Sequence, residues 1–521
     1  MQHLIETVFR LDEAEDVVGL NNFIAQNQYS SNQVFVLLFP LLSRGRLQSA
    51  YVLAMILHQA GLQHIHVSLA LCAGGLLYRK PDDETLGLRL LQEQMASQPG
   101  VINTELLTPV MVGILNAMLQ RPEEGLFLRI VEILKIIAPP FRQIFDWNAP
   151  IPELSLEKMR QGRPAEMPLV INPVPPADAP RPQRRVLILL KQFGTELRYK
   201  KAMTHYGWQA EIYHELPLTE ASAAADCQRL AEVCRQKKID VLFFDVRPFW
   251  QWGAQEGSIA WNSTKVRFLF KQGMQAFLEL KAQLRQENPA FRVFGVLFDS
   301  SDEIERTVLE GEQGFFDGLM SLHHNPSAPH ILDNPQYKQK ILHNYFGPVN
   351  KHDFCNTDRP LVPNMYFRGT IAAGHWVRLL WISAAARFAV PIVQKLNKLE
   401  YDKQAPLDDY AAYMSDLSEA TCCLSIVMSR FVTRYLTYRS FEVPLSGALL
   451  VQDFTPLMHH YFIPGEHYLE FSTIAELAAI ARFITERREE AEAVRRRGHA
   501  FARAHYNDET IIGQIDKFLY H

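Results

Sequence analysis

Hydrophobic positions in the first 148 residues recur at the spacing of amphipathic helices. Within residues 45–63 the apolar positions Leu47, Tyr51, Ala54, Leu57 and Ala60 follow one another before Gly61. Residues 84–95, 106–120 and 125–137 repeat the pattern. Steps of three or four residues place apolar side chains on one side of a helix. We therefore predict an all-α helical domain over residues 1–150.

The predicted helices follow one another in pairs, which indicates a bundle or a short repeat array. The pattern is similar to tetratricopeptide repeats, although no fixed period runs through it. Such a domain would present a surface to an acceptor or to a second copy of the chain, giving a homodimer. A helical cap that only packs on the rest of the molecule is an equal alternative.

A proline-rich segment separates this helical part from the rest of the chain. Residues 167–185 read MPLVINPVPPADAPRPQRR. Prolines at this density favour an extended chain and mark a domain boundary. We predict a linker over residues 151–184 and expect the stretch around residues 167–185 to be exposed.

After the linker the hydrophobic pattern changes to that of buried strands. Residues 185–190, 240–245 and 292–299 are short and almost wholly apolar, and helical patterns lie between them. Strands that are apolar along their length and alternate with helices form a parallel sheet covered on both faces. We predict a Rossmann-like domain over residues 185–322. It lacks G-x-G-x-x-G after its first strand, so a dinucleotide site is not indicated.

The same alternation returns over residues 323–521. Strands are predicted at residues 364–370, 448–453 and 468–471, and a helix that begins near Arg439 ends at Gly447. Thr473 and Glu476 have the spacing of a capping box at the start of a later helix. The expected fold class is α/β, with two Rossmann-like domains after the helical one.

Composition excludes several classes of partner. The net charge is -4, from 53 Lys and Arg against 57 Asp and Glu, so no basic field indicates nucleic acid. No apolar window reaches the length of a membrane span, and the first residues lack the pattern of a signal peptide. The six cysteines show no C-x-x-C spacing. We interpret them as core residues of a cytoplasmic protein.

Polar residues are threaded through the apolar stretch 439–471. In order they form Arg439-x-x-Glu442, Gly447, an apolar strand ending in Asp453, Phe462-x-x-Gly465-Glu466, and later Glu476-Leu477 and His505-Tyr506. The segment FRGT at residues 367–370, followed by Arg378, precedes the series. This ordered series resembles the group 1 glycosyltransferases, and most closely their spore-maturation-protein-like branch. The resemblance covers residues 360–510 and extends to residues 185–320 in layout only.

The resemblance implies two facing Rossmann-like domains, the GT-B fold, with a nucleotide-sugar donor bound between them. It implies transfer of a sugar to a protein or surface-glycan acceptor with no metal and no cofactor. A leaving diphosphate then needs cations and backbone N–H groups. We expect donor binding by Arg439, Arg378, Gly369, Asp453, Gly465 and Glu466, and a catalytic role for Glu442 as the acceptor of hydrogen bonds from donor hydroxyls.

We further expect the Glu442 carboxylate to face the space between the domains, so that its loss would spare the fold. Many enzymes of the group carry a second glutamate eight positions after the first. Here that position is Leu450. The usual ribose contact would then fall to Asp453 or Glu466. Arg439 and Glu442 could instead be an ordinary surface pair one helical turn apart.

An inverting transfer also needs a general base from the first domain. Asp245, Asp299 and His214 lie at predicted strand ends and are the candidates. Each acid could equally cap the helix that comes after it.

Five histidines between residues 323 and 352 suggest a metal site, but their spacing is irregular and no cluster of acids or cysteines accompanies them. We therefore predict no metal there. Two alternatives to the transferase stay open: a non-catalytic scaffold with a degenerate glycosyltransferase-like domain, and another nucleotide-sugar enzyme such as an epimerase.

Overall fold

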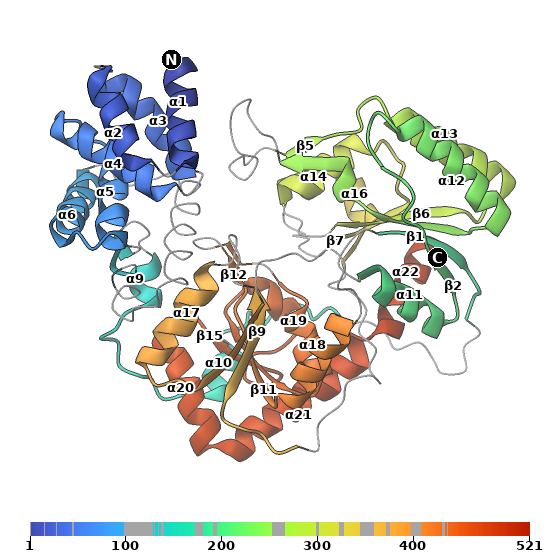
Figure 1. The fold of residues 1–521 in the computed structure, drawn as a ribbon. Helices are drawn as coiled ribbons and strands as arrows, with labels where there is room; N and C mark the ends of the chain where they lie inside the picture. Colours follow the sequence, from blue (N-terminus) through green and yellow to red (C-terminus); the bar gives the residue numbers. More distant parts are fainter. Residues whose placement is uncertain are drawn as a thin grey trace.

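The computed structural model describes most of the chain. The described residues are 2–97, 129–171, 181–190, 195–252, 266–297, 302–321, 328–343, 359–370, 376–397, 408–429 and 433–520, without positions 15, 28, 44, 45, 130, 134, 137–139 and 435. The chain folds into a helical region and two α/β domains (Figure 1).

Helices alone make up the described part of the N-terminal region, as predicted. They are α1 (Gln2–Glu13), α2 (Val17–Gln26), α3 (Ser31–Ser43), α4 (Leu47–Gln59), α5 (Ile65–Leu77), α6 (Pro81–Ser97) and α9 (Pro140–Ile144). The predicted helix over residues 106–120 lies outside the described residues. Helix α5 is buried from Val67 to Leu76. It packs closely on α6, where a Cβ on Gly87 would lie 2.4 Å from the Cys72 nitrogen. Small residues at this crossing let the two backbones approach.

A six-stranded parallel sheet forms the first α/β domain. Its strands are β1 (Arg185–Leu189), β2 (Gln209–Ile212), β3 (Val241–Asp245), β6 (Arg292–Leu297), β7 (Gly318–Ser321) and β8 (Ile341–His343), in the order β2-β1-β3-β6-β7-β8. Helices α11 (Thr195–Tyr206), α12 (Ala223–Lys237), α13 (Met274–Glu287), α14 (Asp302–Gly311), α15 (Pro329–Asp333) and α16 (Pro335–Lys340) accompany it. A hairpin of β4 (Trp250–Trp252) and β5 (Val266–Phe268) follows β3.

A five-stranded parallel sheet forms the second α/β domain. Its strands are β9 (Met365–Thr370), β10 (Ile392–Asn397), β11 (Cys422–Ser425), β14 (Leu449–Asp453) and β15 (Leu469–Phe471), in the order β10-β9-β11-β14-β15. Its helices are α17 (Trp376–Arg387), α18 (Asp408–Glu419), α19 (Arg439–Leu445), α20 (Ile474–Glu486) and α21 (Arg488–His505), and β12 (Met428–Ser429) pairs with β13 (Thr433–Arg434). The capping box of Thr473 and Glu476 is present. The predicted fold class, two Rossmann-like domains after a helical one, is confirmed.

The last helix, α22 (Asp508–Tyr520), belongs to the first domain in space. It lies beside α11 of the first domain (Figure 1). Arg184 Nε contacts Asp516 at 3.3 Å, and Arg292 Nε donates to the Leu519 carbonyl over 3.1 Å. Strand β8 likewise joins the first sheet, pairing with β7. The first sheet therefore includes residues beyond 322, where the sequence pattern placed the boundary.

The segment before the first domain packs on the second domain. Helix α10 (Leu156–Gln161) lies against Gly465, and the Val170 nitrogen donates to the His460 carbonyl over 2.7 Å. The Tyr506 hydroxyl donates to the Val170 carbonyl over 2.7 Å. Residues 156–170, which the sequence pattern assigns to the linker, thus pack along the surface of the second domain.

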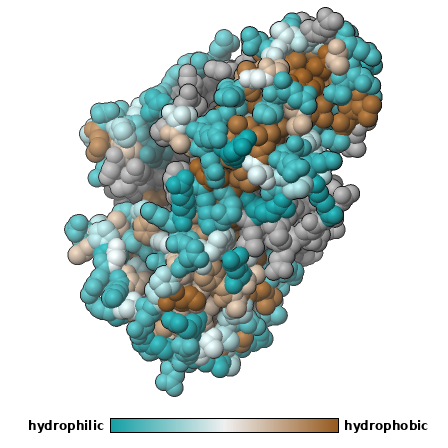
Figure 2. Space-filling model, turned by 90° about the vertical axis from the view of Figure 1, so that its left-hand side faces the viewer, coloured by the Kyte–Doolittle hydropathy of each residue, from teal (hydrophilic) through white to brown (hydrophobic). Residues whose placement is uncertain are grey.

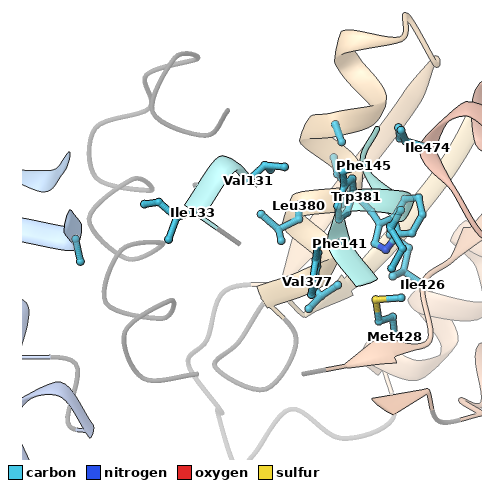
Figure 3. Packing of buried hydrophobic residues seen from close by; sticks show 14 of the residues in the cluster. Val131, Ile133, Phe141, Phe145, Val377, Leu380, Trp381, Ile426, Met428 and Ile474 are labelled. Atoms are coloured by element: carbon cyan, nitrogen blue, oxygen red, sulfur yellow. The ribbon is translucent and has the colours of Figure 1, made fainter. Parts of the chain in front are cut away.

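Aromatic side chains fix the helical region to the second domain. The rings of Phe145 and Trp381 lie 5.0 Å apart, and Trp381 lies 5.0 Å from Phe471 at the end of β15. Figure 3 shows Phe141 and Phe145 in one cluster with Val377, Leu380 and Trp381 of α17. One continuous core therefore joins the two parts.

Within the described residues, no helix is both long and apolar enough to cross a membrane. Figure 2 shows hydrophilic side chains over much of one face, with separate hydrophobic patches between them. Val18 and Val36 of the helical region are 71% and 52% exposed.

Candidate active site at the junction of the two domains

Strand order places the candidate site at the carboxyl end of β9. In the second sheet the chain passes from β9 to β10 on one side, and then to β11 on the other. Parallel sheets bind ligands in the crevice outside the strand ends where the order reverses in this way. The first sheet reverses between β2 and β3, beside β1.

Arg439 lies against the end of β9. Its Nη2 donates to the Arg368 carbonyl, and its guanidinium is 5.2 Å from the centre of the Phe367 ring. A Cβ on Gly369 would lie 2.9 Å from Nη2, so only glycine leaves this space for the guanidinium. Gly369 and Arg439, both predicted as donor-binding residues, therefore come together.

Arg378 of α17 completes a pair of buried arginines. Its Nε donates to the Ile426 carbonyl at the end of β11 over 3.3 Å. Burial, and then the neighbouring charge of Arg439, lower the pKa of Arg378 to about 9. The guanidinium is still charged near neutral pH, but two like charges share a site from which water is largely excluded. Such a pair favours an anion between or beside them.

Glu442 is buried, with 1% of its surface exposed, and lies one helical turn after Arg439. Its Oε1 accepts a hydrogen bond from Arg198 Nη1 over 2.9 Å, and its Oε2 accepts one from the Tyr413 hydroxyl over 2.8 Å. Arg198 belongs to α11 of the first domain and Tyr413 to α18. The Glu442 carboxylate points toward the other domain, but it is buried against an arginine of that domain and is not open to the space between the domains, so the expectation that its loss would spare the fold does not fit this geometry.

Asp453 ends β14 and is fully buried. Its two carboxylate oxygens accept hydrogen bonds from the Val427 and Met428 nitrogens over 2.6 and 2.9 Å. These contacts hold the turn that follows β11. We interpret Asp453 as a residue that shapes the site through this turn.

Gly465 and Glu466 lie away from the arginines. Both precede β15, so they are at the amino edge of a sheet whose carboxyl edge carries the site. Gly465 has φ +73, and a Cβ there would lie 2.5 Å from the Leu156 carbonyl oxygen. The structure thus gives Gly465 a packing role against α10 and does not bring it to Arg439.

Arg368, which the sequence pattern did not single out, adds a third arginine. Its Nη1 contacts Asp416, and its guanidinium is 5.2 Å from the centre of the Tyr413 ring. Lys395 contacts the same carboxylate at 2.8 Å. Both Arg368 and Tyr413 stand in segments that carried the family resemblance, whereas no local pattern singled out Arg198.

Several buried polar atoms at this edge have no hydrogen-bond partner among the described residues. They are Arg368 Nε, Arg439 Nε, Ser425 Oγ, Gln452 Nε2 and Thr455 Oγ1. Buried donors without a partner are costly in a folded protein. Their concentration at one strand edge is typical of a site that receives a polar ligand.

Of the candidate bases predicted in the first domain, Asp245 is already paired with an arginine. Asp245, buried at the end of β3, binds Arg247, whose Nε donates to its two oxygens over 3.0 and 3.1 Å. His214 is exposed, and Asp299 lies outside the described residues. Glu196, in the first turn of α11, has a buried Oε2 with no partner among the described residues.

The structure gathers no group of three or more metal-ligating side chains, as far as the described residues go. His330 is buried and lies 3.0 Å from Glu305, an acid in another helix. His343 is the last residue of β8, and the other three histidines of the cluster lie outside the described residues. The described cysteines, Cys72, Cys227, Cys234, Cys422 and Cys423, are buried free thiols.

A cavity of about 520 Å³ lies at the opposite edge of the first sheet. Arg184, Arg235, Lys238 and Asp240 are among its lining residues, next to the carboxyl ends of α12 and α13. Basic side chains at helix carboxyl ends offset the helix dipole. We therefore interpret this cavity as structural.

Comparison with known proteins bears on the second domain. Residues 366–516 match a family model described as glycosyl transferase-like. The match covers the site residues from Gly369 to Glu466 and confirms, for this part of the chain, the resemblance to glycosyltransferases. Arg198 lies outside it. No curated protein sequence matches the chain.

Solved structures give distant likenesses. HepE of Anabaena, in complex with UDP-glucose, is 11% identical, covering 64% of this chain and 99% of its own, with a TM-score of 0.40. Sucrose-phosphate synthase of Thermosynechococcus elongatus is 13% identical over 65% and 99%, with a TM-score of 0.39. An O-GlcNAc transferase mutant of Thermobaculum terrenum is 12% identical over 94% and 97%, with a TM-score of 0.34.

Proposed function

We propose that the protein is a glycosyltransferase that moves a hexose-type sugar from a nucleotide-sugar donor to a protein or surface-glycan acceptor. The observation that carries this proposal is the set of buried arginines Arg368, Arg378 and Arg439 at the strand-order reversal of the second sheet. The glycosyl transferase-like family match over the same residues supports it.

The arginines suit the charge that develops in the reaction. When the bond between the sugar and the diphosphate breaks, negative charge builds up on the leaving phosphate oxygens. Arg378 and Arg439 would stabilise this charge without a metal, because guanidinium groups bind phosphate oxygens through paired N–H donors. The Nε of Arg439, which has no partner among the residues that the structure describes, supplies one such donor.

The Glu442 carboxylate would bind hydroxyl groups of the nucleotide-sugar donor. A carboxylate can accept about four hydrogen bonds. Two are taken by Arg198 and Tyr413, so the remaining lone pairs have directions fixed by these two donors. Asp245 could act as general base only after Arg247 releases it, and Asp299 remains the second candidate.

The acceptor side of the proposal rests on the helical region. Its helices pack on α17 through Phe145 and Trp381, so it is held at a fixed place relative to the second domain. We propose that it presents the acceptor in the cytoplasm. The rival proposal is a non-catalytic scaffold, which the absence of a second glutamate at Leu450 favours.

Nucleotide binding measured with and without a chelator tests the proposal. Calorimetry and thermal shift would use a panel of nucleoside diphosphates and their sugar conjugates. A ligand at 100 times its Kd adds about 2.7 kcal/mol of stability. We expect one nucleotide to bind equally well in excess EDTA, and Arg439→Gln and Arg378→Gln to weaken binding at least tenfold.

The matched control is Arg235→Gln, which removes an exposed arginine paired with Glu287 far from the site. It should leave nucleotide binding unchanged. Failure of every nucleotide to bind would reject the transferase. Binding without any sugar release or transfer would favour the scaffold, and loss of binding in EDTA would reject the metal-free mechanism.

A further inference from the structure

Arg198 crosses from its own domain into the candidate site. It lies in α11, which follows β1, the strand beside the order reversal of the first sheet. Its guanidinium contacts Glu442 at 2.9 Å and lies 5.4 Å from the centre of the Tyr438 ring. Only 14% of its side chain is exposed. One site thus contains side chains from both domains.

The contact fixes the direction of the Glu442 carboxylate. Arg198 holds Oε1 and Tyr413 holds Oε2, so α11, α18 and α19 together orient one acid. Burial, and then the charge of Glu442, raise the pKa of Tyr413, which keeps its hydroxyl a donor at neutral pH. Groups locked by such contacts bind ligands in a defined geometry.

A purely structural role would be to hold the domains together. The chain already links the domains at α22, which continues from α21 of the second domain and packs on α11, with Asp516 paired to Arg184. His205, at the other end of α11, also contacts Asp508 of α22 at 3.1 Å. A buried ion pair is in general weak evidence for stability. The Arg198 contact therefore has more to do with the site than with docking.

We infer that Arg198 is a positioning residue of the first domain that orients Glu442 toward the sugar of the donor. This role rests on the proposed function and concerns the sugar part of the donor. Arg198 acts on the sugar through Glu442, whereas Arg378 and Arg439 serve the diphosphate. Loss of Arg198 should therefore affect a nucleotide sugar and spare the bare nucleoside diphosphate.

The test compares two ligands in the full-length protein. Calorimetry would give the Kd of the nucleoside diphosphate and of the matching nucleotide sugar for Arg198→Ala and Arg198→Lys. For Arg198→Ala we expect a change of less than twofold for the diphosphate and a loss of about tenfold for the nucleotide sugar. Arg198→Lys keeps the charge and should recover part of the loss.

Two further variants separate positioning from stability. In a Glu442→Gln background, Arg198→Ala should add less than a twofold loss, because its effect passes through Glu442. His205→Ala removes a different contact of α11, the one between His205 and Asp508 of α22. It should change the Kd of neither ligand.

Three results would overturn the inference: equal losses for both ligands, no loss for either, or a full additional loss in the Glu442→Gln background. If the wild-type protein binds no nucleoside diphosphate at all, the proposed function fails first.

Discussion

Arg198 of the first domain and Glu442 of the second are 244 positions apart in the chain and form a 2.9 Å ion pair. Glu442 is 1% exposed and the Arg198 side chain 14%. The pair joins the two strand-end regions at which parallel sheets bind their ligands. Burial and pairing give Glu442 a part in stability that the sequence pattern did not indicate.

Glu442→Gln should destabilise the protein. The change leaves Arg198 without its counter-charge at a buried position, a loss that typically costs about 3 kcal/mol or more. For a unit of 150–250 residues this corresponds to a fall in Tm of roughly 6–12 °C. Scanning calorimetry measures it. Glu287→Gln, at an exposed pair, should cost less than about 1 kcal/mol. An unchanged Tm for Glu442→Gln would show that water compensates the loss.

Gly369→Ala should move the Arg439 guanidinium. The new methyl group would lie 2.9 Å from Nη2, and the flexible end of the arginine can shift aside. We expect a small change in stability and about a tenfold loss of nucleotide affinity, since a displaced cation loses its hydrogen bonds. In an Arg439→Gln background the glycine substitution should have little further effect. Undiminished affinity in Gly369→Ala would separate Arg439 from the nucleotide.

Asp453→Asn should act through the turn after β11. The amide would turn an N–H group toward Val427 or Met428, whose nitrogens need an acceptor, and each lost charge-assisted hydrogen bond costs about 1.5–3 kcal/mol. We expect a clear fall in Tm by calorimetry. Glu466→Gln, half-buried at the other sheet edge, should stay within about 0.5 kcal/mol. A normal Tm with lost nucleotide binding would instead make Asp453 a ligand contact.

His467 should make stability fall in acid. Its ring stacks on Phe501 at 4.2 Å and its Nδ1 accepts from the Ile463 nitrogen. Burial, and then the charge of Arg497, lower its pKa from 6.5 to about 4. The carboxylate of Glu466, 3.7 Å away, opposes this shift, but it is partly exposed and screened by water.

The unfolded chain therefore binds a proton at His467 between pH 6.5 and 4, and the folded protein does not. The contribution of His467 to the free energy of unfolding is fully present above pH 6.5. It falls as the pH drops toward 4, by up to about 3 kcal/mol. Urea unfolding of wild type and His467→Asn over this range measures the difference. Substitution of the exposed His214 by Asn should leave the change of unfolding free energy with pH as in the wild type. If His467→Asn shows the same pH dependence as the wild type, the shifted pKa is contradicted.

The sequence predicted the fold class because the strands of the first sheet have short apolar centres, such as residues 241–244, and alternate with helical patterns. It also singled out Gly369 in β9, Arg378 in the helix after β9, and Arg439, and the structure brings these three residues together at one strand edge. It could not place Arg198, because hydrophobic periodicity carries no information on a contact 244 positions away.

The assignment of Gly465 shows a second limit. A glycine beside a strand is compatible with either edge of the sheet, and only the strand direction shows that Gly465 lies at the amino edge, against Leu156. The proline-rich stretch was equally ambiguous. Residues before 171 are held by Tyr506 and by the backbone of His460, which are contacts that a local composition cannot reveal.

The crossing of α22 has a consequence for biosynthesis. Its apolar face, with Ile511, Ile512 and Ile515, shares a core with Val186 and Ile188 of β1, yet the ribosome makes it more than 300 residues later. Domains usually fold as they emerge, the N-terminal ones first. Here one face of the first sheet is covered only in part, by α11, until the second domain has been synthesised. Apolar surface left exposed in this way during translation is where chaperones bind.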